Sequence, residues 1–196
     1  MDIHGFWALI ERSATVTDTR ADRVAWLTDQ LADKPVDEIA DYLALWDVTR
    51  DRAWEWDLYA AYWAVMGSGS LDGFEYFVAW LIGLGRDPYE LVVECPDRLI
   101  ELPAMTRMLA FRRTRPEDLW SYEDYPEFEV LGYVAFDAYE RATGDAEGLS
   151  EAVRARRAER RRPARGTGLR GDEWNLHDFD EHALRLPLIA RWLETG

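Results

Sequence analysis

The sequence predicts an all-α fold, a compact domain of roughly seven to nine helices. Apolar residues recur at spacings of three and four along most of the chain, as they do on one face of an amphipathic helix. Ser, Thr, Asp, Gly and Pro stand where these stretches begin and end, which is typical of helix termini. No stretch shows the apolar–polar alternation of a half-buried strand.

The N-terminal third of the chain predicts three amphipathic helices. Apolar residues at helical spacing lie within residues 3–10, 24–31 and 39–46. Thr17 or Asp18 can cap the second helix, because a side-chain oxygen there accepts a hydrogen bond from a free backbone N–H group. Pro35 suits the first turn of the third helix, where its missing N–H is not needed.

The centre of the chain predicts a helical hairpin. Residues 53–66 are apolar on nearly every side, which indicates a buried helix that ends at the glycines of residues 67–69. Ser70 or Asp72 caps the next helix, whose apolar face lies within residues 74–82. A further helix starts at Asp87–Pro88. We expect one buried aromatic cluster in this hairpin, made of Trp56, Phe74, Phe77 and Trp80.

The C-terminal half has a weaker pattern. We expect a short helix over residues 105–111, a loop over 112–126, and a clear helix that starts at Pro126 and ends near Gly144. A surface helix over 149–162 precedes the breaker cluster at 163–171. The tail from Trp174 to Trp192 carries enough apolar side chains to dock on the body of the protein.

Composition and charge restrict the possible functions. The 196 residues are 48% hydrophobic, which supports a single domain over residues 1–196. A net charge of -15 disfavours nucleic acid and anionic membranes as partners. No apolar run is long enough to span a membrane, and the N-terminus lacks the pattern of a signal peptide, so we expect a cytoplasmic protein.

Residues 150–171 depart from the overall acidity. Residues 151–170 hold eight Arg and two Glu, a local charge of +6. We expect an Arg-rich helix followed by a flexible loop, exposed and mobile because like charges repel and offer little to bury. An electrostatic contact with an acidic face of the same or a second molecule fits this segment, as does a plain solvated helix. A contact with nucleic acid is the weaker alternative.

Several motifs point to one family. They are Phe6–Trp7, Trp56–Asp57–Leu58, the glycine turn 67–69, Asp72-x-Phe74-x-x-Phe77, Trp80–Leu81–Ile82, and Gly85–Arg86 followed by Tyr89–Glu90. This pattern resembles DUF4240, a bacterial family of unknown function, most strongly over residues 54–99. Pro96–Asp97 and Leu186–Pro187 also look similar to it, whereas Val78 stands where the family pattern has arginine. The resemblance implies a fold but no activity.

A group of polar and aromatic residues beside the hairpin forms a candidate binding site: Trp56, Asp57, Asp72, Glu75, Trp80 and Arg86. One interpretation is an acidic pocket for a cation, an amine or a basic peptide, with carboxylates that can also act as acid and base. The simpler interpretation is structural. Asp57 and Arg86 then form a buried hydrogen-bonded pair, and Asp72 caps a helix.

The sequence gives little support for a metal site or for a nucleophilic catalytic residue. His177 and His182 are five residues apart, not four as in a helical metal pair, so we predict solvated side chains and no metal site. Cys95, the single cysteine, has no histidine near it in sequence and is predicted to be a buried, inert thiol. No phosphate-binding loop or hydrolase motif occurs. We predict no cofactor and name no catalytic residue.

Two functions remain as hypotheses. The first is a non-enzymatic interaction or regulatory module, whose acidic, aromatic-rich surface binds a protein or peptide partner. The second is an enzyme that acts on a small cationic substrate in a carboxylate–aromatic pocket. An open cleft that gathers the carboxylates favours the enzyme, and a filled core there favours the interaction module. An acidic mimic of DNA is a third and weaker idea, and the sequence says nothing about the oligomeric state.

Overall fold

The computed structural model describes residues 1–145, 147–159 and 168–195, and this part of the chain is helical with connecting turns and loops. The described residues form eleven α-helices and no named strand, so the all-α prediction is confirmed and the predicted number of helices is too low. The α-helices are α1 Ile3–Val16, α2 Arg20–Ala32, α3 Val36–Ala53, α4 Trp56–Met66, α5 Leu71–Gly83, α6 Arg86–Glu94, α7 Pro103–Thr114, α8 Val134–Thr143, α9 Gly148–Glu159, α10 Phe179–Arg185 and α11 Pro187–Thr195. Short 3-10 helices are η1 Pro96–Glu101, η2 Glu117–Leu119, η3 Tyr122–Asp124 and η4 Glu129–Tyr133.

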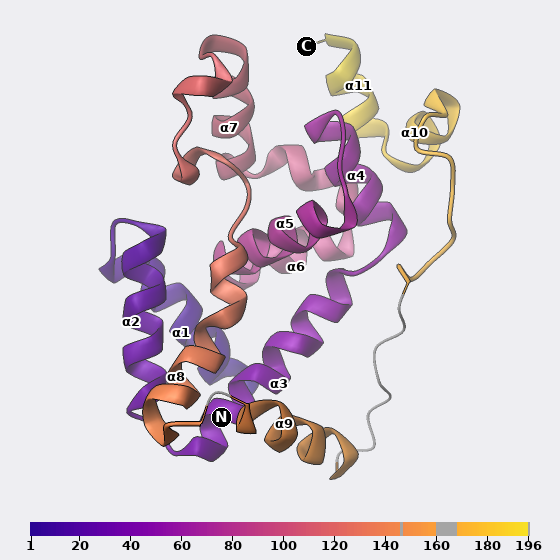
Figure 1. Ribbon diagram of the computed structural model, residues 1–196. Helices are drawn as coiled ribbons and strands as arrows, with labels where there is room; N and C mark the ends of the chain where they lie inside the picture. The colour runs from indigo at the N-terminus through magenta and orange to yellow at the C-terminus, as the bar shows by residue number, and fades with distance from the viewer. Residues whose placement is uncertain (146, 160–167, 196) are drawn as a thin grey trace.

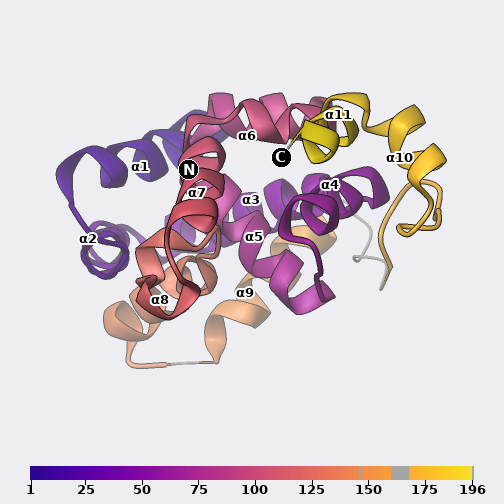
Figure 2. The same cartoon turned by 90° about the horizontal axis from the view of Figure 1, so that it is seen from above.

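The helices pack around a central group of α3, α4, α5 and α6. The pair α1 and α2 lies on one side, and α8 packs against both α2 and α3 (Figure 1). Seen from above, α1, α6 and α11 follow one edge, and α8 and α9 lie on the opposite side (Figure 2). Helix α9 packs on α3, and η4 packs on α5. Four segments that are distant in sequence, α3, α5, η4 and α9, therefore meet in one region.

The predicted aromatic cluster is present with one residue at its margin. Phe74, Phe77 and Trp80 are buried, with centroid distances of 6.2 Å for Phe74–Phe77 and 5.6 Å for Phe77–Trp80. Trp56 is only partly buried and reaches the cluster through Tyr59, whose ring lies 5.9 Å away. Residue 78, which is valine here, is fully buried in α5 and therefore belongs to the core.

Helix ends follow the predicted cap residues in the central hairpin. Ser70 caps α5 by accepting a hydrogen bond from the Gly73 backbone N–H at 3.0 Å, and Gly67 ends α4 with a φ of 78°. Asp72 lies within the first turn of α5, so its predicted role as the N-cap is wrong. Thr19, not Thr17 or Asp18, caps α2. Pro126 does not open α8, because the 3-10 helix η4 comes between them.

The C-terminal stretch docks on the body, as predicted. Arg170 exchanges backbone hydrogen bonds with Trp54 and Trp56, and Trp174 is buried. The buried Asp97 carboxylate accepts hydrogen bonds from the backbone N–H groups of Leu188 and Ile189, at 2.8 to 3.0 Å. Asp97 therefore caps α11, where its negative charge also meets the positive end of the helix dipole.

The Arg-rich segment is described only in part. Residues 148–159 are helical, with Leu149 and Val153 buried and Arg154 exposed. Residues 160–167, most of the predicted loop, lie outside the described residues, so the predicted mobility stays a prediction. Among the described helices, none combines the length and the hydropathy needed to cross a membrane.

Candidate functional site

A cleft of about 440 Å³ opens between α3, α5, η4, α8 and α9. Its charged lining consists of four carboxylates and two guanidinium groups: Asp47, Arg50, Asp72, Glu75, Glu129 and Arg154. Its aromatic lining consists of Trp46, Tyr76, Tyr133 and Phe136. The cleft thus combines negative charge with aromatic surface, the combination that organic cations prefer.

Arg50 holds two walls of the cleft together. Its Nη1 lies 3.2 Å from Glu75 Oε1 and its Nη2 lies 3.4 Å from Asp47 Oδ1, which links α3 to α5. The Arg50 side chain is about four-fifths buried, with 20% of its surface exposed. The Nε atom of Arg50 is buried without a hydrogen-bond acceptor in the described part of the chain. Glu75 is therefore occupied by an internal partner.

Glu129 lies between two tyrosine hydroxyls. The Tyr133 hydroxyl is 3.4 Å from Glu129 Oε1. The negative charge of Glu129 is the main cause that raises the pKa of Tyr76 above its usual value. Burial and then Glu129 raise the pKa of Tyr133. The negative charge of Asp72 also raises the pKa of Tyr76, so carboxylates act on both tyrosine hydroxyls.

Of the six residues predicted for the site, the cleft brings together two, Asp72 and Glu75. They lie one helical turn apart on α5, as their spacing predicts. Trp80 is on the same helix but lines a different cavity, next to α7. Trp56 packs at the margin of the aromatic cluster.

The predicted buried pair of Asp57 and Arg86 is wrong. Asp57 lies in the first turn of α4, and its side chain is 46% exposed. It accepts a hydrogen bond from Trp174 Nε1 at 3.0 Å and lies 3.5 Å from Arg185 Nη1. Arg86 begins α6, where its side chain is exposed and its backbone N–H donates to Glu11. The error arises because α5 ends at Gly83 and Arg86 starts a separate helix, while the C-terminal stretch supplies the partners of Asp57.

Two further predictions about single residues are corrected. Cys95 is exposed and lies at the C-terminal end of α6, directly before Pro96. His182 is buried, with 4% of its surface exposed, because α10 docks it against Trp63 and Trp174. His177 is exposed, as predicted. No group of side chains suited to hold a metal ion occurs among the described residues.

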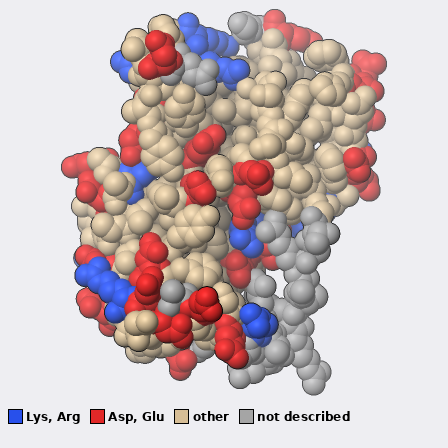
Figure 3. Space-filling view, viewed as in Figure 1, with Lys and Arg blue, Asp and Glu red and all other residues tan. Residues whose placement is uncertain are grey.

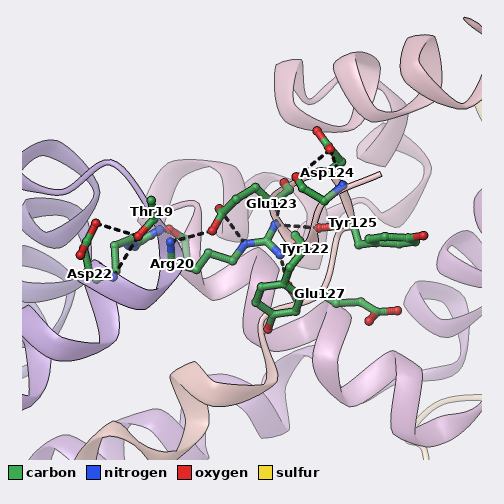
Figure 4. A network of polar contacts seen from close by, with 11 residues as sticks. Thr19, Arg20, Asp22, Tyr122, Glu123, Asp124, Tyr125 and Glu127 are labelled. Carbon is green, nitrogen blue, oxygen red and sulfur yellow. Dashed lines mark hydrogen bonds and ion pairs between the residues drawn. The ribbon is translucent and has the colours of Figure 1, made fainter. Parts of the chain in front are cut away.

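A second polar centre was not predicted at all. Figure 4 shows Arg20 reaching from α2 into the loop of residues 122–127. Its guanidinium donates hydrogen bonds to four backbone carbonyls, those of Tyr122, Glu123, Tyr125 and Glu127. The Glu123 carboxylate lies 3.5 Å from Arg20 Nε. Arg20 thereby fixes the loop that leads to η4 and Glu129.

The sequence offered few signals for the missed cleft residues. Asp47 and Arg50 are three residues apart on a predicted helix, a spacing that places them on one face. The contact of Arg50 with Glu75, and the approach of Glu129, join residues tens of positions apart. Only the packing of α3, α5 and η4 brings these groups together.

Comparison with known proteins identifies a family and nothing more specific. A family model described as "Protein of unknown function (DUF4240)" matches residues 1–141. Neither the curated proteins nor the solved structures contain a match to this chain. The matched region includes α3, α5 and η4, and α9 lies beyond it.

Proposed function

Because the chain belongs to the DUF4240 family, which has no assigned function, we propose a function from the cleft: a binding module for a positively charged side chain of a protein partner. The observation that supports this proposal is the convergence of Asp72, Glu75 and Glu129 beside aromatic rings in an open cleft. Glu75 already pairs with Arg50, so Asp72 and Glu129 are the carboxylates offered to a ligand.

The surroundings of the cleft favour a macromolecular partner. Acidic side chains predominate on the lower half of the face in Figure 3, the region of α2, α3, α8 and α9. The chain as a whole carries a net charge of -15. Such a surface attracts basic partners over a distance and raises the rate of association at low salt.

The test is calorimetric titration with an acetylated and amidated Lys-rich octapeptide and its Gln counterpart. We expect saturable binding of the Lys peptide only, weaker at higher salt because screening shortens to about 3 Å at 1 M. Glu129→Gln should weaken binding about tenfold, because a hydrogen bond to a charged group contributes roughly 1.5–3 kcal/mol. Asp72→Asn should weaken it less, since Asp72 is exposed.

Matched controls separate the cleft from general acidity. Glu140→Gln and Asp137→Asn remove the same charges from exposed positions of α8 that do not line the cleft. Equal losses in cleft and control variants would contradict the proposal. So would equal binding of the Gln peptide.

A small cationic substrate is the second candidate. Glu129 beside two tyrosine hydroxyls provides a base and potential acids in one place, which supports this alternative. Butylamine, titrated under the same conditions, distinguishes the two. Binding of butylamine as tight as that of the peptide would favour the small substrate, and binding of the peptide alone favours the protein partner.

A further inference from the structure

A second cavity, of about 290 Å³, is separate from the acidic cleft. It lies between the turn that precedes α2, the end of α5, α7 and the segment 123–128. Trp80, Met108 and Phe111 give it apolar walls. Its cationic lining is unusual for a protein this acidic, because three arginines contribute to it: Arg20 and Arg23 from α2 and Arg107 from α7.

Arg23 carries a partly buried charge, and its hydrogen bonds within the described part of the chain go to neutral acceptors. Its Nε donates to Ser13 Oγ at 3.1 Å, and its Nη2 donates to the carbonyls of Ile10 and Gly83 at 3.2 and 2.9 Å. Burial lowers the pKa of the Arg23 guanidinium, and the positive charge of Arg20 lowers it further. Buried charges are normally paired with an opposite charge. Nη1 of Arg23 has no acceptor within the described ranges, so it retains donors for a ligand.

Arg107 provides a second guanidinium on another wall. Its side chain is exposed, and the described residues give it neither an ion pair nor a hydrogen bond. An exposed arginine can swing toward a bound ligand at little cost. Arg23 therefore offers hydrogen-bond donors from a fixed position, and Arg107 offers them from a side chain that can adjust to the ligand.

Three carboxylates, those of Asp18, Glu123 and Asp124, also line the cavity and balance the three arginines in formal charge, but none of them forms a hydrogen bond or ion pair with Arg23 or Arg107 among the described contacts. Glu123 accepts the Arg20 backbone N–H at 2.9 Å and lies 3.5 Å from Arg20 Nε, so the charges of Glu123 and Arg20 offset each other and leave Arg23 and Arg107 as the cations available to a ligand. Asp124 accepts hydrogen bonds from the backbone N–H and the hydroxyl of Ser121, at 2.8 and 2.7 Å. Asp18 is exposed in the turn before α2, where water screens it.

We propose that this cavity binds a small organic carboxylate with an apolar body, whose carboxylate pairs with Arg23 and Arg107 and whose body packs on Trp80 and Phe111. A guanidinium fork matches a carboxylate in geometry and forms strong charge-assisted hydrogen bonds with it. The cavity volume lies near the lower end of the range for small-molecule sites, about 300 Å³, which fits a ligand with one ring.

The experiment uses 3-phenylpropionate as the probe, measured by calorimetric titration of the full chain. We expect saturable binding of 3-phenylpropionate, and no binding of the neutral amide of the same shape or of inorganic phosphate. Acetyl-Gly-Phe with a free carboxylate tests the second source of this chemistry, the C-terminus of a peptide. Tighter binding of 3-phenylpropionate identifies a small free carboxylate as the ligand, and tighter binding of acetyl-Gly-Phe identifies a peptide C-terminus. Either result supports the site.

Two variants locate the binding. Arg107→Gln is expected to weaken the binding of 3-phenylpropionate about tenfold, since charged hydrogen bonds contribute roughly 1.5–3 kcal/mol. Arg12→Gln makes the same charge change at an exposed position of α1 outside this cavity and should leave binding unchanged. The proposal is overturned if the amide binds as well as the acid, if no probe saturates, or if the two variants behave alike.

Discussion

Tyr62 and Gly69 approach each other so closely that no larger residue fits in place of the glycine. A Cβ atom at residue 69 would lie 2.5 Å from Tyr62 Cε1. The tyrosine ring cannot retreat, because it is packed against Phe74 and Phe77 at centroid distances of 5.6 and 5.0 Å. The turn between α4 and α5 therefore requires glycine at residue 69, because glycine has no side chain.

Gly69→Ala should lower the free energy of unfolding by about 1–3 kcal/mol, the usual cost of forcing extra atoms into a packed site. Urea denaturation measures the change. Gly168→Ala is the matched control, because a Cβ at residue 168 meets no atom within 4 Å. Equal stability of the two variants would show that the turn has room to adjust.

Single residues also show the limit of prediction from sequence. Asp72 and Glu75 were correctly predicted to lie together, because three residues along a helix place both on one face. Glu129 was missed, since a 3-10 helix more than fifty residues later carries it to the same cleft. Asp57 was given the wrong partner because its actual partners, Trp174 and Arg185, lie more than a hundred residues later, and only the docking of the tail brings them to α4.

At the scale of elements, α11 is held by a residue that is distant in sequence. Asp97 accepts hydrogen bonds from two successive backbone N–H groups at the start of this helix, and its side chain is buried. The same helix packs on η1 and α4. Its position thus rests on one carboxylate together with the apolar contact.

Asp97→Ala should detach α11 while the rest of the fold persists. We expect a loss of roughly 1–3 kcal/mol, because buried N–H groups are left without an acceptor. Hydrogen exchange measures this directly, with faster exchange at Leu188 and Ile189 than in α5. Asp97→Asn keeps an acceptor oxygen and should lose less. Unchanged protection of α11 in both variants would refute this role.

The element pattern explains why the fold class was predictable and the helix count was not. Ser70 and Gly67 carry local signals for a helix start and end, and both act as predicted. In the tail, Pro187 does mark the start of α11, but Leu186 alone separates this helix from α10, so the apolar residues of the tail do not divide into two clear helices. Short helices of this kind are stabilised by docking more than by local sequence.

At the scale of the whole molecule, three core tyrosines make the fold sensitive to alkali. Burial raises the pKa of Tyr62 to about 12 and also raises the pKa values of Tyr42 and Tyr89. In the unfolded chain these hydroxyls ionise near pH 10, at about their ordinary pKa. The folded state thus holds its protons more tightly, and this stabilisation is complete below about pH 10 and lost as the pH rises further.

We therefore expect the free energy of unfolding to fall between about pH 10 and pH 12, by up to about 1.4 kcal/mol per pH unit for each tyrosine. Tyr62→Phe removes one of these groups and should make the decline shallower. Urea denaturation at a series of alkaline pH values measures both. A variant with the same slope as the parent would show that Tyr62 ionises alike in both states.

The Asp97 cap on α11 can form only late in the synthesis of the chain. Asp97 precedes the backbone N–H group of Leu188 by 91 residues. At a translation rate of about 5–20 residues per second, the carboxylate emerges roughly 5–18 s before the group it will bind. Helices α7 to α10 are made in that interval, and water must serve as the partner of Asp97 throughout it. The nascent protein therefore keeps a hydrated opening at η1 until α11 arrives to close it.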